Sequence, residues 1–590
     1  MPTLIHRLDR WANDAPSDPA QAFLSQGDWK IITAAQYRDR IFYLALFLES
    51  RGFGRDDTAA IFSYNCPEVV HLDFAPHLIG GKSFGIYPNT SSKDLQYILG
   101  LTGAKVIAVQ NKSYFEKLGG VLPPTVKMIL TFGQDTSFSE LAVSYQTAIE
   151  EGKKLSQGKK IEDYLKRLEK KAGAFLIFTS GTTGHPKGAM LSHDNLVAAA
   201  DVAIETWKIP VKDHGRMFSF LPLCHIAEKL QNECVGISGH YCVHFCSKFE
   251  NLSVELPAVK PTVLLCVPRL WEKMMEGVQA RLKNEMGLKK QMVDWAFKIG
   301  ERYVRALYAD EGFMISPLIA LQYRFAEALV FKKIRARLGL SDCVRAGSGA
   351  AALSSHVVWW FRIIGIEIYE DFGQTESTGI ICMTVPGRDC AGTVGKPVDG
   401  LEFKIADDGE ICCKGRLVFV GYFNNEQATK ETVVDGWLQT GDLAELDSRG
   451  YVKIKGRKKE IMKTSSGKMI APSPIEEKIK VHELVSQVCI VGDGKKYFSA
   501  LITLSASALK ALGDQGELNG ETVEQSAIRQ TIKDHLDEVN LGLAGFEKIK
   551  YFTILSREFS VDEGEMTPTL KLKRNIVENH FQHLIEKMYP

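Results

Sequence analysis

The sequence predicts an α/β protein with more than one folded unit, and three observations support this. At 590 residues, the chain exceeds the length at which a single hydrophobic core stops growing. Short apolar runs alternate with helix-like segments over 60–110, a rhythm typical of βαβ units and a parallel sheet. Beyond position 400, the runs become shorter and turn dipeptides separate them.

The strand and helix signals follow in order along the chain. Strands are expected at TAAIFSY, SFGIYP and AKVIAVQ within 60–110, and again at 174–180, 262–268 and 365–373. SKDLQYILGLTG is expected to be helical, and so is a long charged stretch at about 269–337, which we interpret as an amphipathic packing layer.

Tight turns mark the region after position 400. Asp435-Gly436 and Arg449-Gly450 are dipeptides that favour turns between strands. From about 457 onward a smaller α+β unit is expected. It has helices at 473–482 and 523–540 and a strand pair near 487–504.

The charge balance excludes a general electrostatic attraction to nucleic acid. The chain has 72 basic and 71 acidic side chains, a formal net charge of +1. No run approaches about 18 apolar residues, so no membrane-spanning helix is expected, and peripheral membrane contact stays open. The twelve scattered cysteines and the absence of a signal-peptide pattern at the start favour free thiols and a cytoplasmic location.

A loop dense in glycine and hydroxyl residues is the sharpest local feature. It follows the apolar strand Phe175–Phe178 and precedes a helix that opens near Ser192. Glycines allow close backbone approach, while hydroxyls, amides and a lysine can contact phosphate oxygens. The spacing does not satisfy the Walker A pattern. We interpret the loop as phosphate-binding rather than as a polar surface turn, with these candidates: Thr179, Ser180, Gly181, Thr182, Thr183, Gly184 and Lys187.

The string FTSGTTGHPKGAMLSHDNL (178–196) resembles the signature of the AMP-forming adenylate synthetases. This superfamily contains acyl-CoA synthetases, luciferases and peptide-synthetase adenylation domains. Four further regions match the family in order: GIYPNTSS (85–92), LPLCHIAEKL (221–230), YEDFGQTES (369–377) and 436–479. Several phrases, among them TPTLKLKRNI, look most like long-chain or bubblegum-type fatty acyl-CoA synthetases.

The resemblance implies a two-domain architecture. Residues 1–456 would form a large N-terminal domain with parallel-rich sheets, helices and a distorted β-barrel. Residues 457–590 would form a smaller, mobile α+β domain, with a hinge near Lys459. It also implies the reaction: a fatty acid, ATP and CoA give acyl-CoA, AMP and pyrophosphate through an acyl-adenylate, with Mg²⁺ as cofactor.

The resemblance assigns roles to residues of the nucleotide site. Glu376 would bind magnesium together with Thr179, Thr375 would contact phosphate, and Phe372 would lie against adenine. Gly349 and the motif residues Asp371 and Gly373 would line the same site. Asp442 would bind the ribose and Arg457 would contact the nucleotide. Taken alone, Glu376 would be interpreted as a helix cap, and Asp442 and Arg457 as solvated turn charges.

Further roles are implied for the acyl pocket and the C-terminal domain. His225 matches a histidine beside the acyl pocket, although a structural, hydrogen-bonded histidine is an open alternative. Gly467 matches the glycine beside the pantetheine arm of CoA, with a simple turn glycine as the alternative. Lys571 is our choice for the adenylation lysine and Lys573 is its rival. Many members of the family carry a glycine immediately before this lysine, whereas Leu570 stands here.

A metal site and two rival functions are the other interpretations of the sequence. A metal site at His240, Cys242, His244 and Cys246 is disfavoured, because four alternate strand positions span roughly 20 Å and cannot surround one zinc ion. One rival function is a related enzyme that stops at the adenylate or passes the acyl group to a carrier protein. A second is a degenerate nucleotide-binding protein that acts as a lipid sensor or scaffold. The second rival conflicts with the intact set of polar site residues.

Overall fold

The computed structural model describes residues 2–119, 122–179, 185–211, 214–308, 315–387, 390–514, 518, 520–567 and 571–589. The chain divides into two compact units, which we describe separately. The large unit comprises Met1–Leu353, Val358–Phe403 and Cys413–Gln439. The small unit comprises Ser354–Val357, Lys404–Cys412 and Thr440–Pro590.

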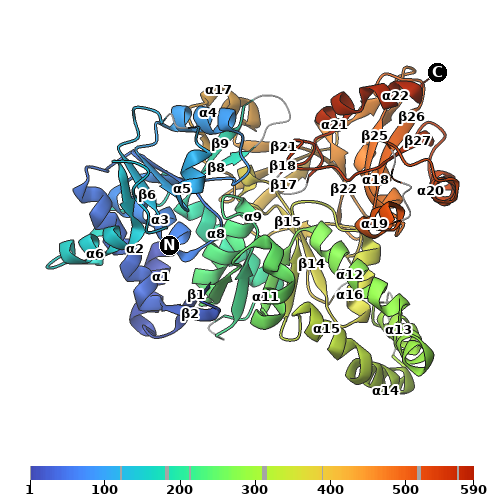
Figure 1. The fold of residues 1–590 in the computed structure, drawn as a ribbon, viewed down its shortest axis with the longest axis horizontal. Coiled ribbons are helices and arrows are strands. Elements are labelled where there is room, and N and C mark those ends of the chain that lie inside the picture. The colour runs from blue at the N-terminus through green and yellow to red at the C-terminus, as the bar shows by residue number, and fades with distance from the viewer. Residues whose placement is uncertain are drawn as a thin grey trace. The chain divides into compact units, whose positions relative to one another are not determined.

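The strands confirm the predicted α/β class with parallel-rich sheets (Figure 1). The largest sheet has the order β19 (Gly421–Tyr422), β9 (Lys187–Ser192), β8 (Gly173–Thr179), β4 (Lys82–Ile86), β3 (Thr58–Phe62), β5 (Val106–Val109), β6 (Met128–Thr131) and β7 (Ala142–Ser144). A second sheet has the order β10 (Arg216–Ser219), β11 (Cys242–Phe245), β1 (Pro19–Ser25) and β2 (Asp28–Thr33). A third has the order β12 (Val263–Cys266), β13 (Arg345–Ser348), β14 (Ile368–Phe372), β15 (Cys382–Met383) and β16 (Lys396–Pro397).

The remaining strands form a curled sheet, a short hairpin and a three-stranded sheet. The curled sheet has the order β17 (Leu401–Ile405), β18 (Glu410–Gly415), β21 (Trp437–Leu446) and β20 (Val433–Val434), with β22 (Val452–Arg457) paired to β21. The hairpin pairs β23 (Met462–Lys463) with β24 (Met469–Ile470), and the last sheet joins β25 (Val485–Val491), β26 (Phe498–Leu504) and β27 (Ile549–Leu555).

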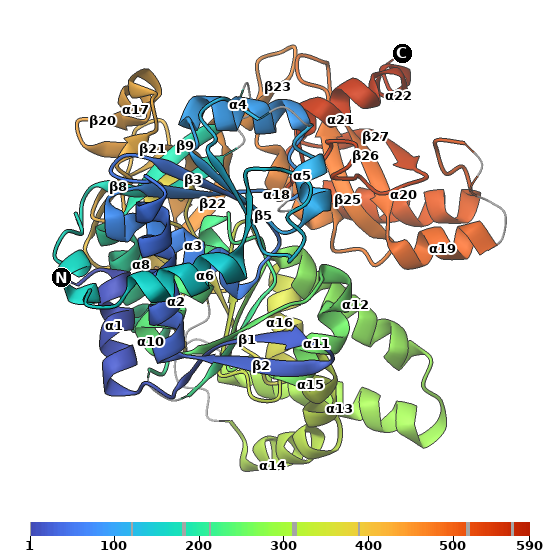
Figure 2. The same ribbon diagram turned by 60° about the vertical axis from the view of Figure 1, so that its left-hand side comes forward.

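The helices of the large unit pack around the sheets of that unit. Among them, α2 packs against α1 and α6 (Figure 2). Their bounds are α1 (Leu4–Asp14), α2 (Ala34–Ser50), α3 (Pro67–Phe74), η1 (Ala75–Ile79), α4 (Ser92–Thr102), α5 (Lys112–Glu116), α6 (Tyr145–Leu155), α7 (Ile161–Leu165), α8 (His193–Trp207), α9 (Ile226–Glu228), η2 (Lys229–Val235), α10 (Gly236–Gly239), η3 (Phe249–Asn251), α11 (Leu252–Val259), α12 (Pro268–Lys283), α13 (Gly287–Leu307), α14 (Pro317–Ala326), η4 (Glu327–Phe331), α15 (Lys332–Leu338), η5 (Thr375–Ser377) and α17 (Glu426–Thr432). Helix α16 (Ser355–Ile363) has residues in both units.

The central strands of the largest sheet are parallel and buried. Every residue of β3, β5 and β6 is buried, as expected for strands covered by helices on both faces. Side chains of this sheet share one hydrophobic cluster with residues of α4, including Leu95 and Leu99. The predicted strands at 58–64, 83–88 and 104–110 therefore form, and the intervening helix is α4.

The small unit has a sheet with a hydrophobic cluster on each side. One cluster joins the sheet to α18 (Pro472–Ile479), α19 (Ala506–Asp514) and α20 (Ser526–Leu541). The other joins it to α21 (Arg574–His580) and α22 (Gln582–Lys587). A single helical turn, η6 (Lys458–Glu460), precedes these helices in the chain. The expected helices and strand pair form here, while β27, which pairs parallel to β26, is an addition to the prediction.

The alternating histidines and cysteines do not share one strand. Cys242 and His244 lie in β11, between β10 and β1. His240 instead ends α10 in a left-handed conformation with φ of 60° and stacks on Trp11, with ring centroids 4.7 Å apart. Among the described residues, no group of three or more His, Cys, Asp or Glu is placed to hold a metal ion. No described helix is long and apolar enough to cross a membrane.

Candidate active site

The glycine-rich loop joins two antiparallel strands. Thr179 ends β8 and pairs with Lys187, which begins β9. The Thr179 hydroxyl donates to the Lys187 carbonyl oxygen over 3.4 Å. These two residues therefore stand at the base of the loop, while the candidates Ser180, Gly181, Thr182, Thr183 and Gly184 lie outside the described residues. The sequence did not predict strand β9. Its six residues lie inside the signature string, which gives no separate strand signal.

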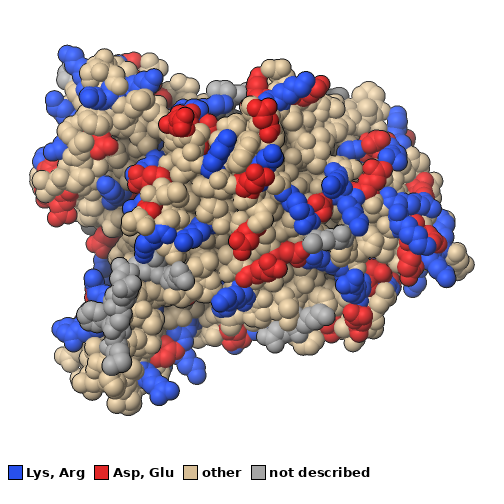
Figure 3. All heavy atoms as spheres, turned by 180° about the vertical axis from the view of Figure 1, so that it is seen from behind, with Lys and Arg blue, Asp and Glu red and all other residues tan. Residues whose placement is uncertain are grey.

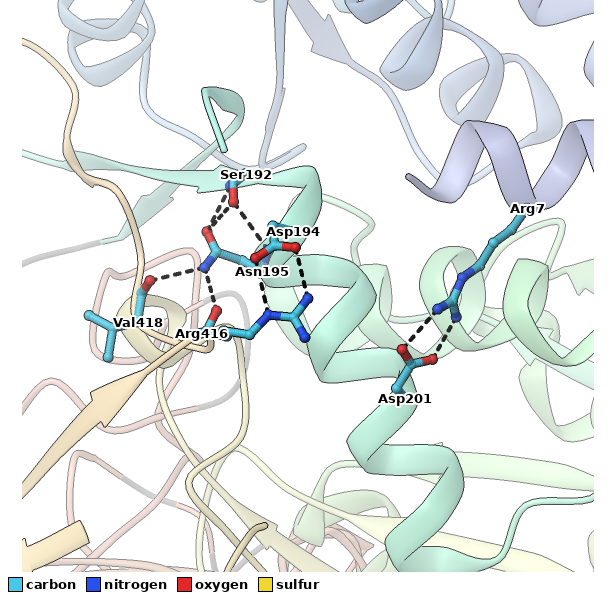
Figure 4. A network of polar contacts seen from close by, with 7 residues as sticks. All are labelled: Arg7, Ser192, Asp194, Asn195, Asp201, Arg416 and Val418. Atoms are coloured by element: carbon cyan, nitrogen blue, oxygen red, sulfur yellow. Dashed lines mark hydrogen bonds and ion pairs between the residues drawn. The ribbon is translucent and has the colours of Figure 1, made fainter. Parts of the chain in front are cut away.

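The helix after this hairpin begins where the sequence predicts it. Ser192 caps α8 by accepting from the Asn195 amide, and the Asn195 side chain accepts from Ser192 in return. Asn195 also donates to the carbonyl oxygens of Arg416 and Val418, at 2.6 and 3.0 Å (Figure 4). The Arg416 guanidinium binds Asp194 through two nitrogens, at 3.1 and 2.7 Å. The start of α8 is thereby fixed to a distant segment.

A second ion pair holds the middle of α8. Arg7 of α1 donates to both carboxylate oxygens of Asp201, at 2.7 and 2.8 Å (Figure 4). Arg7 also donates to the Ser238 hydroxyl at 2.8 Å. A two-pronged contact of this kind fixes orientation as well as distance, so α8 is anchored along its length.

Tyr422 connects the loop lysine to the predicted magnesium ligand. Its hydroxyl donates to Glu376 Oε1 at 2.6 Å, and the Lys187 ammonium lies 5.1 Å from its ring centroid. Tyr422 and Glu376 are both buried. Burial, followed by the negative charge of Glu376, raises the pKa of Tyr422, so the hydroxyl keeps its proton and remains a donor. Two predicted site residues, separated widely in sequence, thus contact one aromatic side chain.

The residues from 416 to 423, here called the 416–423 segment, bind both motifs through the backbone. The Phe419 amide donates to the Glu376 carbonyl oxygen at 2.9 Å, and the Thr378 hydroxyl donates to the Leu417 carbonyl oxygen at 2.6 Å. Toward β9, the Phe423 amide donates to the Gly188 carbonyl oxygen at 2.8 Å. Sequence reasoning missed this segment, including Tyr422, because RLVFVGYF carries no signal beyond an apolar strand.

Two predicted glycines occupy positions that exclude a side chain. A Cβ on Gly373 would lie 2.4 Å from the Gly379 carbonyl oxygen, and one on Gly349 would lie 2.5 Å from an Asp371 carboxylate oxygen. Such distances are too short for real atoms, so the backbone approaches closely at both positions. Gly349 and Asp371 are therefore neighbours, as their shared assignment requires. Within the same motif, Phe372 is half-buried and Thr375 is buried.

The carboxyl ends of β13 and β14 bring polar atoms together in the interior. Ser348 ends β13 and is paired with Glu370 of β14. Among the described residues, the Ser348 hydroxyl and Asp371 Oδ1 are inaccessible to solvent and have no hydrogen-bond partner. Buried polar atoms nearly always have partners. In open α/β sheets, ligands bind at the carboxyl ends of the strands, so these atoms are suited to receive one.

The acidic residues of this edge hold their protons unusually well. Burial raises the pKa of Glu370 to about 8 and that of Asp371 to about 7. Glu370 accepts from the Leu353 amide at 3.4 Å. Because burial favours the protonated form of both carboxyls, less negative charge opposes a phosphate-bearing ligand here than two ordinary carboxylates would present.

His225 has a structural contact of its own. It caps α9, and its Nδ1 accepts from the Ala227 amide at 3.2 Å, which places the proton of a neutral ring on Nε2. The adjacent Cys224 packs on Gly85 of β4, where an added Cβ would lie 2.6 Å from the Cys224 Cβ. Asn65 fixes the preceding turn by donating to the Leu221 carbonyl oxygen at 2.6 Å. The capping contact matches the structural alternative, and a role beside an acyl pocket stays a prediction.

In the small unit, Asp442 and Arg457 lie opposite each other on β21 and β22. The Arg457 Nε lies 3.0 Å from the buried Asp442 Oδ1, while Arg457 remains nearly half exposed. Next to Arg457, Lys458 contacts Asp408 and Glu410 at 2.6 and 2.9 Å. The predicted hinge residue Lys459 is exposed, in the single turn η6. The sequence did not predict the Asp442–Arg457 pair.

Gly467 lies in the turn between β23 and β24. Its φ is 80°, and its amide donates to the Thr464 carbonyl oxygen at 2.8 Å. Glycine adopts this conformation at little cost, which gives the turn interpretation a physical basis. An added Cβ would meet no atom within 4 Å, so the side open to solvent has room for a ligand chain as well.

Lys571 bonds to Thr567, while residues 568–570 lie outside the described residues. Its amide donates to the Thr567 hydroxyl at 3.0 Å, and its carbonyl oxygen accepts from the Thr567 amide at 2.7 Å. Lys573 precedes α21, where the half-buried Arg574 pairs with Glu476 of α18 at 2.7 Å. The two lysines are both half-buried, and the choice between them stays a prediction.

With these sites described, comparison with known proteins assigns the family. The AMP-binding enzyme family matches residues 8–423, and the AMP-binding enzyme C-terminal domain matches residues 459–590. The chain therefore belongs to the AMP-binding enzyme family, which confirms the resemblance drawn from its motifs. The domain boundary after residue 456 stays a prediction.

Curated relatives cover nearly the whole chain. Long-chain-fatty-acid–CoA ligase FadD15 of Mycobacterium bovis is 32% identical over 582 residues, which are 96% of this chain and 93% of that protein. Long-chain-fatty-acid–CoA ligase ACSBG2 of Homo sapiens is 30% identical over 610 residues, covering 97% of this chain and 90% of that protein. Among solved structures, the adenylation domain of a Mycobacterium chelonae carboxylate reductase has a TM-score of 0.73 at 21% identity, covering 100% of this chain and 91% of that one. That structure supports the fold alone.

The raised pKa of Glu370 predicts a pH dependence of stability. A carboxyl whose pKa is higher in the folded chain takes up a proton on folding, so its contribution is present below the ordinary value of 4.5 and lost as pH rises through about 8. Glu370→Gln should therefore gain stability relative to the parent protein between pH 5 and 8, by roughly 3 kcal/mol. Urea unfolding at several pH values measures this.

The matched control for that experiment is Glu402→Gln, which changes an exposed residue of β17 and should leave the pH dependence of unfolding unchanged. If Glu370→Gln and Glu402→Gln behave alike, the Glu370 carboxyl does not hold a proton in the folded protein.

Proposed function

We propose that this protein is an ATP-dependent, AMP-forming long-chain fatty-acid–CoA ligase. It would convert a fatty acid, ATP and CoA into acyl-CoA, AMP and pyrophosphate. Similarity to such ligases over more than nine-tenths of the chain supports the substrate class. The observation that supports the chemistry is the contact of both Lys187 and Glu376 with Tyr422. It joins a cation at the base of the loop that we propose binds phosphate to the carboxylate that we propose binds magnesium.

In the first half-reaction, a carboxylate oxygen of the fatty acid attacks the α-phosphorus of ATP and pyrophosphate leaves. Both reactants are anions, so the site must neutralise charge and align them. Lys187 and the loop residues Thr179 to Gly184 would hold the phosphates. Thr375 would contact phosphate, and Phe372 would lie against the base. Asp371 and Ser348, with their unpaired buried atoms, would bind the polar edge of the adenine.

The residues present fit a magnesium ion bound together with ATP. Mg²⁺ is usually held by one or two carboxylates plus substrate phosphates and water, so a cluster of three acidic side chains is not required. Glu376 would supply the carboxylate, with Thr179 as a second oxygen donor. Tyr422 binds only Oε1 of Glu376 in the described contacts. The ion would supply positive charge to the phosphate oxygens when bound.

In the second half-reaction, the CoA thiol attacks the acyl carbonyl and AMP leaves. We assign residues 457–590 as a small domain that changes orientation between the two steps, with its hinge at Lys459. Movement of this kind commonly completes a site in stages. Gly467 would lie beside the pantetheine arm, and Asp442 and Arg457 would bind the ribose and the nucleotide. Their mutual ion pair would orient the Asp442 carboxylate.

The location follows from the substrate. A long acyl chain resides mainly in bilayers, so we propose a cytoplasmic protein that contacts a membrane peripherally. His225, whose Nδ1 caps α9, would lie at the acyl pocket.

A chain-length series of fatty acids tests the reaction directly. Recombinant protein with ATP, CoA and each fatty acid should release AMP and form acyl-CoA in equal amounts, with the highest kcat/KM for long chains. Fatty-acid-dependent AMP release without acyl-CoA would instead indicate transfer to a carrier protein. Nucleotide binding without pyrophosphate release would indicate a lipid sensor.

Lys571→Ala should separate the two half-reactions. A cationic amine at the leaving pyrophosphate contributes to adenylation alone, so fatty-acid-dependent pyrophosphate release should fall by about 100-fold or more. Thioester formation from supplied acyl-adenylate should be retained. Lys573→Ala is the matched variant. If Lys573→Ala lost pyrophosphate release and Lys571→Ala retained it, the assignment would move to Lys573.

A further inference from the structure

The helix that runs from α14 through η4 to α15 presents an apolar stripe to solvent. Its outward residues Leu318, Leu321, Phe325 and Leu329 are 63%, 51%, 55% and 44% exposed. They recur at steps of three and four residues, so they share one helix face. We call these four residues the outer stripe.

The opposite face of the same helix accounts for its packing. Ala326, Val330, Phe331 and Ile334 are buried, and Tyr323 stacks on Tyr303 of α13 with ring centroids 4.1 Å apart. The helix is therefore already held by one apolar face, and the outer stripe is a second one. Soluble proteins rarely expose a continuous apolar patch of this kind without a binding role.

Basic residues border the outer stripe. Arg324 is adjacent to Phe325, and Lys332 and Lys333 follow Leu329 by one helical turn; all three are exposed. No ion pair is recorded for any of the three within the described part of the chain. Residues 268–338 hold fourteen Lys and Arg against eight Asp and Glu, a net charge of +6 in a chain whose total is +1.

The surface view agrees with this distribution. Helices α13 and α14 lie in the projection at the lower left of Figure 3, where Lys and Arg border a surface of uncharged residues. Helix α14 has ten residues, about 15 Å in length, which is too short to cross a bilayer. A helix with an apolar face and a basic border is suited to lie in the plane of a membrane surface.

We propose that the outer stripe docks on an anionic lipid bilayer, with Leu318, Leu321, Phe325 and Leu329 inserted among the acyl chains and Arg324, Lys332 and Lys333 at the headgroups. Charge favours this occupant over a second copy of the chain. A symmetric dimer would place the same basic border on both sides of its interface, whereas anionic lipids supply the opposite charge. Docking would give the proposed ligase access to fatty acid dissolved in the membrane. Vesicle binding can be measured independently of the ligase reaction.

Vesicle co-sedimentation of the full-length protein tests the surface. The parent protein should bind vesicles of phosphatidylcholine and phosphatidylserine, and bind phosphatidylcholine alone more weakly. The double variant Leu321→Gln/Phe325→Gln should lose binding by on the order of tenfold or more, since it removes the inserted apolar area. The triple variant Arg324→Gln/Lys332→Gln/Lys333→Gln should lose the preference for phosphatidylserine and its sensitivity to salt.

Control variants change residues elsewhere that are at least as exposed. Val254→Gln/Leu541→Gln replaces two apolar side chains that are 72% and 84% exposed. Lys153→Gln/Lys154→Gln/Lys160→Gln neutralises three exposed lysines of a second basic region. Both controls should bind vesicles like the parent protein. Activity toward fatty acid in detergent should be unchanged in every variant, because none of these residues is assigned to the site.

Three results would overturn the proposal. The first is equal vesicle binding by the parent protein and the outer-stripe variants. The second is loss of binding in the lysine 153, 154 and 160 variant, which would place the contact at that region. The third is concentration-dependent self-association of the parent protein in analytical ultracentrifugation, abolished by Leu321→Gln/Phe325→Gln and without vesicle binding, which would make a second copy the occupant. Vesicle binding without ligase activity would refute the proposed function and leave the docking surface intact.

Discussion

The hydrogen bond from Tyr422 to Glu376 is the contact on which the polar site of the large unit depends. Lys187 and Glu376 come from motifs almost two hundred residues apart, and one aromatic side chain contacts both. The 416–423 segment supports that side chain with backbone hydrogen bonds to β9 and to the Glu376 turn. It also receives Asn195 and Asp194 from the start of α8. A site that must hold charged phosphates needs such rigid support, because small displacements weaken charge stabilisation strongly.

The same unit retains polar groups that the fold itself does not use. Ser348 and Asp371 place unpaired atoms in the interior at the carboxyl ends of β13 and β14, and Glu370 and Asp371 have raised pKa values there. Each unsatisfied buried group costs roughly 1–3 kcal/mol. Such costs are characteristic of ligand sites, where the bound molecule supplies the missing partner. The unpaired polar atoms and the raised pKa values therefore lie together at the carboxyl ends of β13 and β14, which is where a ligand is expected to bind.

The sequence predicted the family, the α/β class and most regular elements, because those depend on local patterns. The strands at β3, β4 and β5 are apolar runs bounded by turns, and Gly373 and Gly349 could be selected since motifs preserve close backbone approaches. Contacts between distant segments were not predictable in this way. Nothing in RLVFVGYF indicates that Tyr422 would reach Glu376, and the pairing of Asp442 with Arg457 depends on the register of β21 and β22. The His240–Cys246 stretch forms a strand only at Cys242–Phe245, because a left-handed turn at His240 removes that residue from the strand.

A double-mutant cycle between Tyr422 and Glu376 tests the central claim most directly, with fatty-acid-dependent exchange of pyrophosphate into ATP as the measurement. Tyr422→Phe keeps the ring beneath Lys187 but removes the hydroxyl, while Tyr145→Phe removes another buried hydroxyl, bonded to His71 at 2.7 Å, as a control for stability. If Tyr422 acts by orienting Glu376, Tyr422→Phe should slow exchange by about tenfold in the parent protein and have almost no effect in Glu376→Gln, a coupling of about 1 kcal/mol. Tyr145→Phe should leave exchange unchanged. Equal reductions by Tyr422→Phe in both backgrounds, or none in either, would contradict the account.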